Sequence, residues 1–217
     1  MSSVMPSPTA ATDHPLWLLD QPLLLASGSV TRRTMLAAAG IPMDACAAAI
    51  DERRVEQRHL AAGGCADGIA EELARAKALH VSAQFPDRLV LGADQTLTCA
   101  GTAFHKPTDL SEVQRQLEAL SGRSHCLTSA YAVVRNSIVL AAGRSSAVMT
   151  MRALSPSFIA RYLQTASDQM TNSVGGYQLE NLGSHLFSTV EGDHFTVLGL
   201  PLLNVLSSLR TLGAVAE

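Results

Sequence analysis

The pattern of apolar and polar positions predicts strands and helices that follow one another without strict alternation. Residues 23–26 form an apolar run typical of a buried strand, and small residues at 27–29 separate it from a helical pattern over 31–39. A second helical pattern begins after Asp67, which we expect to act as its N-cap. The chain therefore starts with a strand, a small-residue turn and a helix.

The middle of the chain predicts a buried strand followed by two hairpins. Asp94 comes shortly after residues 88–92, a candidate buried strand, and the carboxyl end of a strand is where α/β sheets present ligand groups. Turn-forming pairs at 100–101 and 136–137 interrupt stretches of alternating residues. The predicted elements are a strand over 88–92, a small hairpin over 96–99 and 102–105, a helix over 110–120, and a long hairpin over 124–135 and 138–150.

The last third of the chain predicts short elements around a glycine-rich loop at 175–176. These are a helix from Pro156 to about Thr165, strands near 185–190 and 194–198, and a final helix from Pro201 to Gly213. We therefore expect an α/β fold in which helices flank a mixed β-sheet, with two lobes around a cleft. Residues 1–21, rich in Ser, Pro, Thr and Ala, predict a flexible N-terminal arm, and 22–217 a single domain.

Composition places the chain among globular proteins, with 47% hydrophobic residues, 16% charged residues and a net charge of −3. A mildly acidic balance without a basic cluster argues against a nucleic-acid partner, because phosphates require a basic face. No apolar run approaches the roughly 20 residues of a membrane-spanning helix. Because the first 31 residues contain no Lys or Arg, a signal peptide is not predicted, and we expect a cytoplasmic protein without a membrane partner.

Polar residues gather around the first predicted helix. Ser29 and Thr31 lie where a small-residue turn presents backbone N–H groups at the positive end of a helix dipole. Arg32 and Arg33 follow, and guanidinium groups can bind phosphate oxygens in bidentate fashion. The same residues also fit a plain turn followed by two solvated arginines.

Two carboxylates are candidates for chemistry. Asp94 could bind a divalent cation or orient a water for attack on phosphorus, and Glu52 could supply a further oxygen ligand. The alternatives are a turn-forming Asp94 and a polar loop that begins at Asp51. The chain has no P-loop motif, no dinucleotide-binding glycine motif and no nucleophile elbow, which argues against those three classes of enzyme.

Lysine is so rare that each lysine is conspicuous. Of the 16 basic residues, 14 are arginine and only Lys77 and Lys106 are lysine. A general preference for arginine explains the other basic positions. The two lysines are either solvated side chains or compact point charges that contact a polyphosphate.

These segments together resemble the Maf family of nucleotide pyrophosphatases, in the family's order and over about residues 23–213. The matching segments are LASGSVTRR (25–33), IDE (50–52), LARAKA (73–78), LGADQT (91–96), HKP (105–107), LEALSGRSH (117–125), GGYQLENLG (175–183) and EGDHFTVLGLPL (191–202). The resemblance implies an elongated mixed α/β fold, similar to that of the inosine-triphosphate pyrophosphatases, with the site in the cleft between the lobes.

The resemblance also implies a reaction, in which water attacks the α-phosphorus of a nucleoside triphosphate and releases the monophosphate and diphosphate. It implies a divalent cation, such as Mg²⁺, Mn²⁺ or Co²⁺, and a homodimer as a family-level expectation. Asp94 falls on the catalytic aspartate, as proton acceptor or metal ligand, and Glu52 on the family's acidic residue. The substrate-binding positions implied by the family motifs are Ser29, Arg32, Lys77 and Lys106.

Two positions bear on the nucleotide. The family branch that acts on dTTP and UTP has threonine and glutamine where this chain has Gln95 and Glu180. The chain is more similar to the branch that acts on 7-methyl-GTP, although that branch has tryptophan in place of Thr31. Because a glutamate can accept hydrogen bonds from N1 and N2 of guanine, we expect a purine-type or modified nucleotide rather than dTTP.

Two functions from different classes stay open. One is a housecleaning enzyme that hydrolyses noncanonical nucleotides. The other is a nucleotide-binding regulator of cell division, because the family is associated with septum formation. Asp94 favours the enzyme, since a protein that only binds nucleotide has no need of a water-activating carboxylate.

Overall fold

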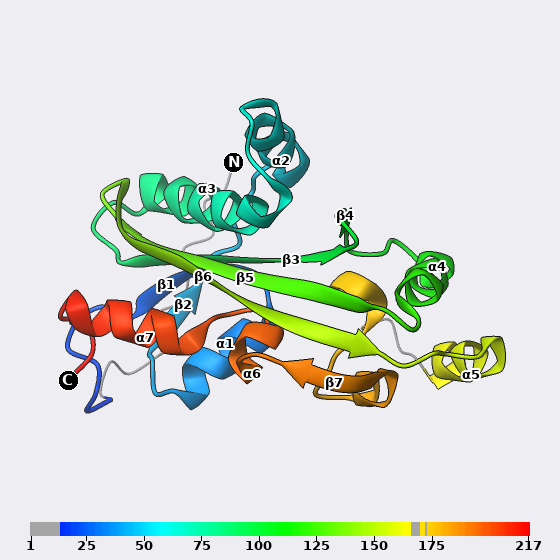
Figure 1. The fold of residues 1–217 in the computed structure, drawn as a ribbon. Helices are drawn as coiled ribbons and strands as arrows, with labels where there is room; N and C mark the ends of the chain where they lie inside the picture. The colour runs from blue at the N-terminus through cyan, green and yellow to red at the C-terminus, as the bar shows by residue number, and fades with distance from the viewer. Residues whose placement is uncertain (1–13, 166–169, 172) are drawn as a thin grey trace.

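The computed structural model describes residues 14–165, 170–171 and 173–217, and these form one seven-stranded sheet with helices on both faces (Figure 1). The strands are β1 (Leu23–Ala26), β2 (Met43–Ala45), β3 (Val90–Cys99), β4 (Thr102–Phe104), β5 (Ser124–Arg135), β6 (Ile138–Met151) and β7 (Phe187–Glu191). Their order is β2-β1-β3-β5-β6-β7, with β4 paired to β3. Since β1 is parallel to β2 and β3 while the other pairs are antiparallel, the predicted mixed α/β sheet is confirmed.

Helices pack on the sheet from both sides. The α-helices are α1 (Val30–Ala38), α2 (Glu52–Ala61), α3 (Ile69–Gln84), α4 (Leu110–Leu120), α5 (Pro156–Thr165), α6 (His194–Val197) and α7 (Leu202–Thr211). Figure 1 shows α3 on one face and α1 and α7 on the other. Ser29, Asp51, Asp109 and Asp193 each cap a helix by accepting a hydrogen bond from the backbone N–H three residues later. Within the described residues, no helix combines the length and apolarity needed to cross a membrane.

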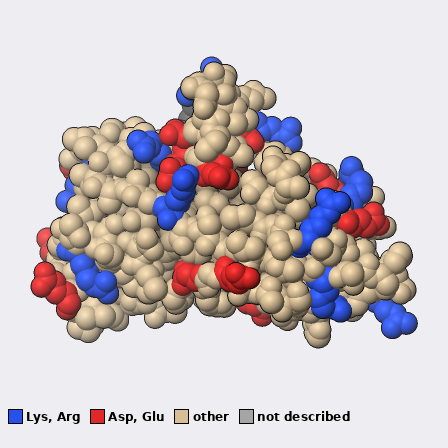
Figure 2. All heavy atoms as spheres, viewed as in Figure 1, with Lys and Arg blue, Asp and Glu red and all other residues tan. Residues whose placement is uncertain are grey.

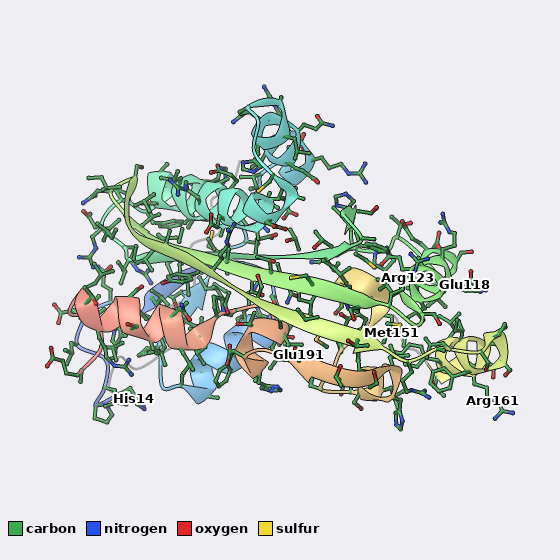
Figure 3. The ribbon with its side chains drawn as sticks, in the orientation of Figure 1. His14, Glu118, Arg123, Met151, Arg161 and Glu191 are labelled. Carbon is green, nitrogen blue, oxygen red and sulfur yellow. The ribbon has the colours of Figure 1, made fainter. Side chains whose placement is uncertain are left out.

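The long β5–β6 hairpin joins two hydrophobic clusters, which form the expected two lobes of an elongated molecule (Figure 1). One cluster packs α1 and α7 against the sheet around Leu36 and Val205. The other packs α4 and α5 around Leu117 and includes Met151, which is buried at the far end of β6. Figure 3 shows Arg161 pointing away from α5 at that end. The hairpin turn is tight because Asn136 and Ser137 both adopt a left-handed conformation, with φ of 53° and 59°.

Several predicted features differ from the structure, and one is the N-cap of the second predicted helix, which is Gly68 at the start of α3 and not Asp67. Asp94 does not follow its strand but lies inside β3, which continues to Cys99 because β5 pairs with it along that length. The polar loop that was one interpretation of Asp51 and Glu52 is wrong, because Asp51 caps α2 and Glu52 is the first residue of that helix. Residues 194–198, expected to be a strand, contain the short helix α6, because Asp193 caps the backbone N–H of Thr196.

The predicted arm over 1–21 is wrong for its last part. Trp17 is buried in the first lobe and forms a β-bridge with Val215, and the backbone N–H of Leu18 donates to the carbonyl of Ala214. Residues 16–18 therefore pair with residues 214–216 of the C-terminal segment. Residues 1–13 of the predicted arm lie outside the described residues.

A buried histidine lies in the second lobe. Nε2 of His125 is 2.6 Å from the hydroxyl of Tyr177, whose ring packs edge-on against Phe187. Nδ1 of His125 has no hydrogen-bond partner among the described residues. Burial lowers the pKa of His125 from 6.5 to about 4, so the imidazole is neutral at pH 7.

This burial predicts a pH dependence of stability. Between pH 6.5 and 4 the unfolded chain binds a proton at His125 that the folded chain does not, so the free energy of unfolding falls as the pH falls through this window. The loss is at most about 3 kcal/mol for a shift of this size. His125→Phe should flatten the dependence while lowering stability at pH 7, because the Tyr177 hydroxyl loses its partner. Urea unfolding across pH 4–7 checks this, and an unchanged slope in the variant would contradict it.

Candidate active site

A cavity of about 1130 Å³ brings together residues from distant parts of the chain. It contains all but one of the residues singled out from the sequence, namely Ser29, Thr31, Arg32, Glu52, Lys77, Asp94, Gln95, Lys106 and Glu180. The exception is Arg33, which is exposed and is not among the residues that line the cavity. Successive helix residues point in different directions, so the adjacent arginines do not share the site.

A close approach between α3 and β3 positions the centre of the site. A Cβ atom at Gly92 would collide with the carbonyl oxygen of Ala74 and would lie 2.7 Å from the backbone nitrogen of Ala78. Side chains two residues apart on a strand point to the same face, so Asp94 faces α3 as Gly92 does. The absence of a side chain at Gly92 therefore lets Lys77 of α3 reach Asp94.

Lys77 forms an ion pair with two carboxylates at once. Its Nζ lies 2.6 Å from Oδ1 of Asp94 and 2.7 Å from Oε1 of Glu52. Lys77 is 9% exposed and Asp94 is 8% exposed, so both charges are shielded from water. A buried charge of this kind is stable only when it is paired, and Lys77 thus compensates two negative groups that would otherwise repel each other.

Glu52 stays a carboxylate because of the surrounding cations. Partial burial alone would raise its pKa, but the hydrogen bond and charge of Lys77 lower it, with contributions from Lys106 and Arg32, and the net pKa lies below the ordinary 4.5. Glu52 occupies the first turn of α2, where a negative side chain also interacts favourably with the helix dipole. In Figure 2, acidic side chains gather at the base of the projecting α2 segment, with basic side chains beside them.

Arg32 is buried and mostly satisfied by the protein itself. Its Nε donates to the carbonyl of Gly199 at 2.8 Å, and its Nη1 donates to Oγ of Ser27 at 3.0 Å and to the carbonyl of Ala93 at 2.9 Å. Burial lowers the pKa of the guanidinium, and the charge of Asp94 opposes this effect. The two N–H groups of Nη2 make no hydrogen bond within the described part of the chain, so they are the donors that Arg32 can offer to a ligand.

Gln95 connects β3 to the short helix α6. Its Nε2 donates to the carbonyls of Thr196 and Val197, both at 3.0 Å, and Oγ of Ser129 donates to the same Thr196 carbonyl at 2.7 Å. Both amide hydrogens of Gln95 are thus used, and only Oε1 is left to meet a ligand. At this position Gln95 can accept a hydrogen bond but not donate one.

The cavity also contains residues that sequence reasoning missed. Arg53 and Glu56 line it from α2, and Nε2 of His105, which also lines it, lies 3.9 Å from Oε1 of Glu56. Gln178 and Asn181 line it from the late loop and are joined by a 2.8 Å hydrogen bond. The N-cap Asp51 signals the start of α2, and recognising that helix would place Glu52 and Glu56, four residues apart, on one face.

The donor set fits a cation that is bound together with a polyphosphate. Asp94 and Glu52 each present one oxygen to Lys77, which leaves Oδ2 and Oε2 for another cation. No group of three His, Cys, Asp or Glu side chains within the described residues could hold a metal ion by itself. Mg²⁺ commonly uses one or two carboxylates with substrate phosphates and waters as the remaining ligands, and this site offers that number.

A protein family and named relatives match nearly the whole chain. The family described as Maf-like protein matches residues 22–212. A Rhodopseudomonas palustris protein named nucleoside triphosphate pyrophosphatase is 53% identical over 197 residues, which cover 90% of this chain and 96% of that protein. A Rhizobium johnstonii protein named 7-methyl-GTP pyrophosphatase is 49% identical over 193 residues, covering 89% and 97%. Among solved structures, a HAM1 protein from Coxiella burnetii matches 59% of this chain and 72% of that chain, with 20% identity and a TM-score of 0.42.

The contact at Gly92 yields a prediction for the site. Gly92→Ala forces α3 away from β3, because two of the colliding atoms belong to backbone, and we expect the free energy of unfolding to fall by about 3 kcal/mol. Gly28→Ala is the matched control, since a Cβ there meets only the Cβ of Ala47 at 3.9 Å. Urea unfolding of both variants measures the difference. Equal stability of the two variants would show that the approach of α3 and β3 does not depend on Gly92.

Proposed function

The chain belongs to the Maf family, and from this premise we propose that it hydrolyses a nucleoside triphosphate to the monophosphate and diphosphate in the cavity around Asp94. Relatives about half identical over nine-tenths of the chain are named as pyrophosphatases of nucleoside triphosphates or of 7-methyl-GTP. The chain is therefore an enzyme, a nucleoside triphosphate pyrophosphatase. The role of each residue in the reaction is our proposal.

The observation that carries this proposal is the contact of Lys77 with both Asp94 and Glu52 inside one cavity that Arg32 and Lys106 also line. A triphosphate requires several positive groups, and the attacking water requires a carboxylate close to them. Phosphoryl-type transfer is governed chiefly by positioning and by neutralisation of charge. The cavity supplies both requirements.

The reaction assigns a separate task to each group. Water attacks the α-phosphorus, a new P–O bond forms, and the bond from that phosphorus to the oxygen bridging the α- and β-phosphates breaks, so that diphosphate leaves. Asp94 accepts the proton of the water through the carboxylate oxygen that Lys77 does not contact. Nη2 of Arg32 and the ammonium of Lys106 hold phosphate oxygens.

We assign a divalent cation to Glu52, completed by substrate phosphates and water, with Oδ2 of Asp94 as a further ligand before it takes up the proton of the water. When bound, the cation neutralises charge on the triphosphate. When no cation is bound, the positive charge of Lys77 offsets the repulsion between the two carboxylates. The surrounding cations keep Glu52 ionised and therefore able to act as a ligand.

For the nucleotide, we propose a purine-type or modified base such as 7-methylguanine. Gln95 has both amide hydrogens committed to α6, so it offers an acceptor, and Glu180, which also lines the cavity, offers acceptors only. The N1 and N2 groups of guanine are donors and complement such a wall. Thr31 lines the cavity as well, and it supplies no aromatic ring for stacking.

Hydrolysis of such nucleotides would be a housecleaning role. This role, the location in the cytoplasm and the homodimer all stay predictions. The alternative, a nucleotide-binding regulator of cell division, differs in one measurable respect. A regulator would bind nucleotide tightly without metal-dependent turnover. The presence of Asp94 in the cavity that Arg32 and Lys106 also line favours turnover.

A substrate and metal panel tests the proposal. We expect diphosphate release from 7-methyl-GTP to exceed that from dTTP and UTP, and to require Mg²⁺, Mn²⁺ or Co²⁺. Asp94→Asn should lower kcat by at least about 100-fold, because it removes the proton acceptor, while nucleotide affinity changes less.

Asp87→Asn is the matched control for this panel, because Asp87 is exposed and does not line the cavity. Its activity should equal that of the unchanged enzyme. Near-normal turnover by Asp94→Asn would overturn the catalytic assignment. A clear preference for dTTP would overturn the interpretation of Gln95 and Glu180.

Replacing lysine by arginine keeps the positive charge and changes the shape of the group that carries it. Lys77→Arg should lower kcat about tenfold or more, because a planar guanidinium does not fit where one nitrogen contacts two carboxylates in a buried space. Lys106→Arg should be milder and act mainly on KM, since Lys106 is exposed. Arg75→Lys on the exposed side of α3 is the control. Steady-state kinetics check this, and equal activity of Lys77→Arg and the unchanged enzyme would contradict it.

A further inference from the structure

A buried glutamine on α4 contacts two separate walls of the cavity. Gln116 is 7% exposed. Its Nε2 donates to the carbonyl of His105 at 2.9 Å, and its Oε1 accepts from the backbone N–H of Gly175 at 3.1 Å. One side chain thus connects the loop after β4 with the late loop, although these segments lie 70 residues apart in the chain.

The two partners fix the orientation of the amide. The carbonyl of His105 can only accept a hydrogen bond, and the N–H of Gly175 can only donate one. A flipped amide would set oxygen against oxygen and N–H against N–H. Each half of the Gln116 amide therefore has one specific partner, and neither contact can be exchanged for the other.

Both contacts lie next to residues that line the cavity. The carbonyl of His105 belongs to the same peptide group as the N–H of Lys106, and the following Pro107 has a restricted φ. The N–H of Gly175 belongs to the same peptide group as the carbonyl of Val174, which lines the cavity. Gln116 therefore fixes the backbone directly beside Lys106 and Val174, which line the cavity.

The late loop has little space to adjust by itself. Gly175 and Gly176 have φ of 80° and 70°, a conformation that favours glycine. A Cβ at Gly176 would lie 2.6 Å from a methyl group of Val113, and Tyr177 is held by its hydrogen bond to His125. The loop is packed against α4 on one side, and the hydrogen bond from Gly175 to Gln116 fixes its position along that helix.

We propose that Gln116 is a positioning residue, which sets the distance between the phosphate-binding Lys106 and the loop of Gln178, Glu180 and Asn181. The proposal depends on the function proposed above for the cavity. Gln116 does not line the cavity and acts through the two backbone groups that it binds. Its loss would leave a carbonyl and an N–H without partners in a buried place, so both loops would have to move to find water.

Hydrogen–deuterium exchange tests the positioning without reference to turnover. Gln116→Met keeps the size of the side chain and removes both hydrogen bonds, so segments 103–107 and 173–177 should both exchange about tenfold faster. Gln116→Glu keeps an acceptor for Gly175 and loses the donor to His105, so only segment 103–107 should exchange faster. Unchanged exchange of both segments in Gln116→Met would overturn the proposal.

Gln114→Met is the matched control. Gln114 lies on the exposed side of the same helix and donates to Glu118, which does not line the cavity and which Figure 3 marks on α4. This variant removes a glutamine hydrogen bond from α4 without touching either loop. Its exchange at 103–107 and 173–177 should equal that of the unchanged protein, and faster exchange at both segments would show that Gln116 has no special role.

Kinetics then separate positioning from general stability. Gln116→Met should raise KM about tenfold with kcat within about twofold, because Asp94, Lys77 and Arg32 are untouched. A double variant with Lys106→Met should show less than the product of the two separate effects on KM, since both act on one contact. A lowered Tm with unchanged KM would mean that Gln116 is structural only and would overturn the proposal. Absence of turnover in the unchanged enzyme would refute the proposed function, while the exchange result would still decide the role of Gln116.

Discussion

The arrangement of the cavity depends on how closely α3 lies against β3. Gly92 removes the one side chain that would separate them, and this places the ammonium of Lys77 within hydrogen-bond distance of Asp94. At that distance the lysine also reaches Glu52 on α2, so three elements meet at one nitrogen atom. A missing side chain on a strand therefore determines the electrostatics of a site two residues away.

Backbone carbonyls of α6 and of the turn after it complete the arrangement. Arg32 donates to the carbonyl of Gly199, and Gln95 donates to those of Thr196 and Val197. Arg32 makes three hydrogen bonds to the protein, so its side chain has little rotational freedom left. Less entropy is therefore lost when Arg32 binds a ligand. The C-terminal segment, distant in sequence from α1 and β3, thus serves to fix the side chains that these elements present.

Local signals predicted most of the elements, and tertiary contacts decided the rest. The pairs at 100–101 and 136–137 located both hairpins because left-handed turns require particular residues. Helix α2 was not predicted, because it has no buried residue and hence no apolar stripe. The sequence predicted that the strand ends at Gly92, before Asp94. In the structure Asp94 pairs with Ala130 of β5, and this pairing continues β3 beyond Asp94. Nine residues of the cavity were predictable from motifs, whereas Arg53 and Glu56 were missed together with helix α2. The amide of Gln116 was not predictable, because its two partners are backbone groups.

The contact between Glu52 and Lys77 links α2 to whatever else binds that lysine. Because α2 contributes no buried residue, this ion pair is one of the attachments that hold the helix over the cavity. An anion that binds Lys77 competes with Glu52, so occupancy of the cavity and the position of α2 are thermodynamically linked. Such linkage is reciprocal: any change that favours the Glu52 contact weakens binding of the anion by the same factor. The affinity of the cavity for such an anion therefore includes the free energy of moving α2.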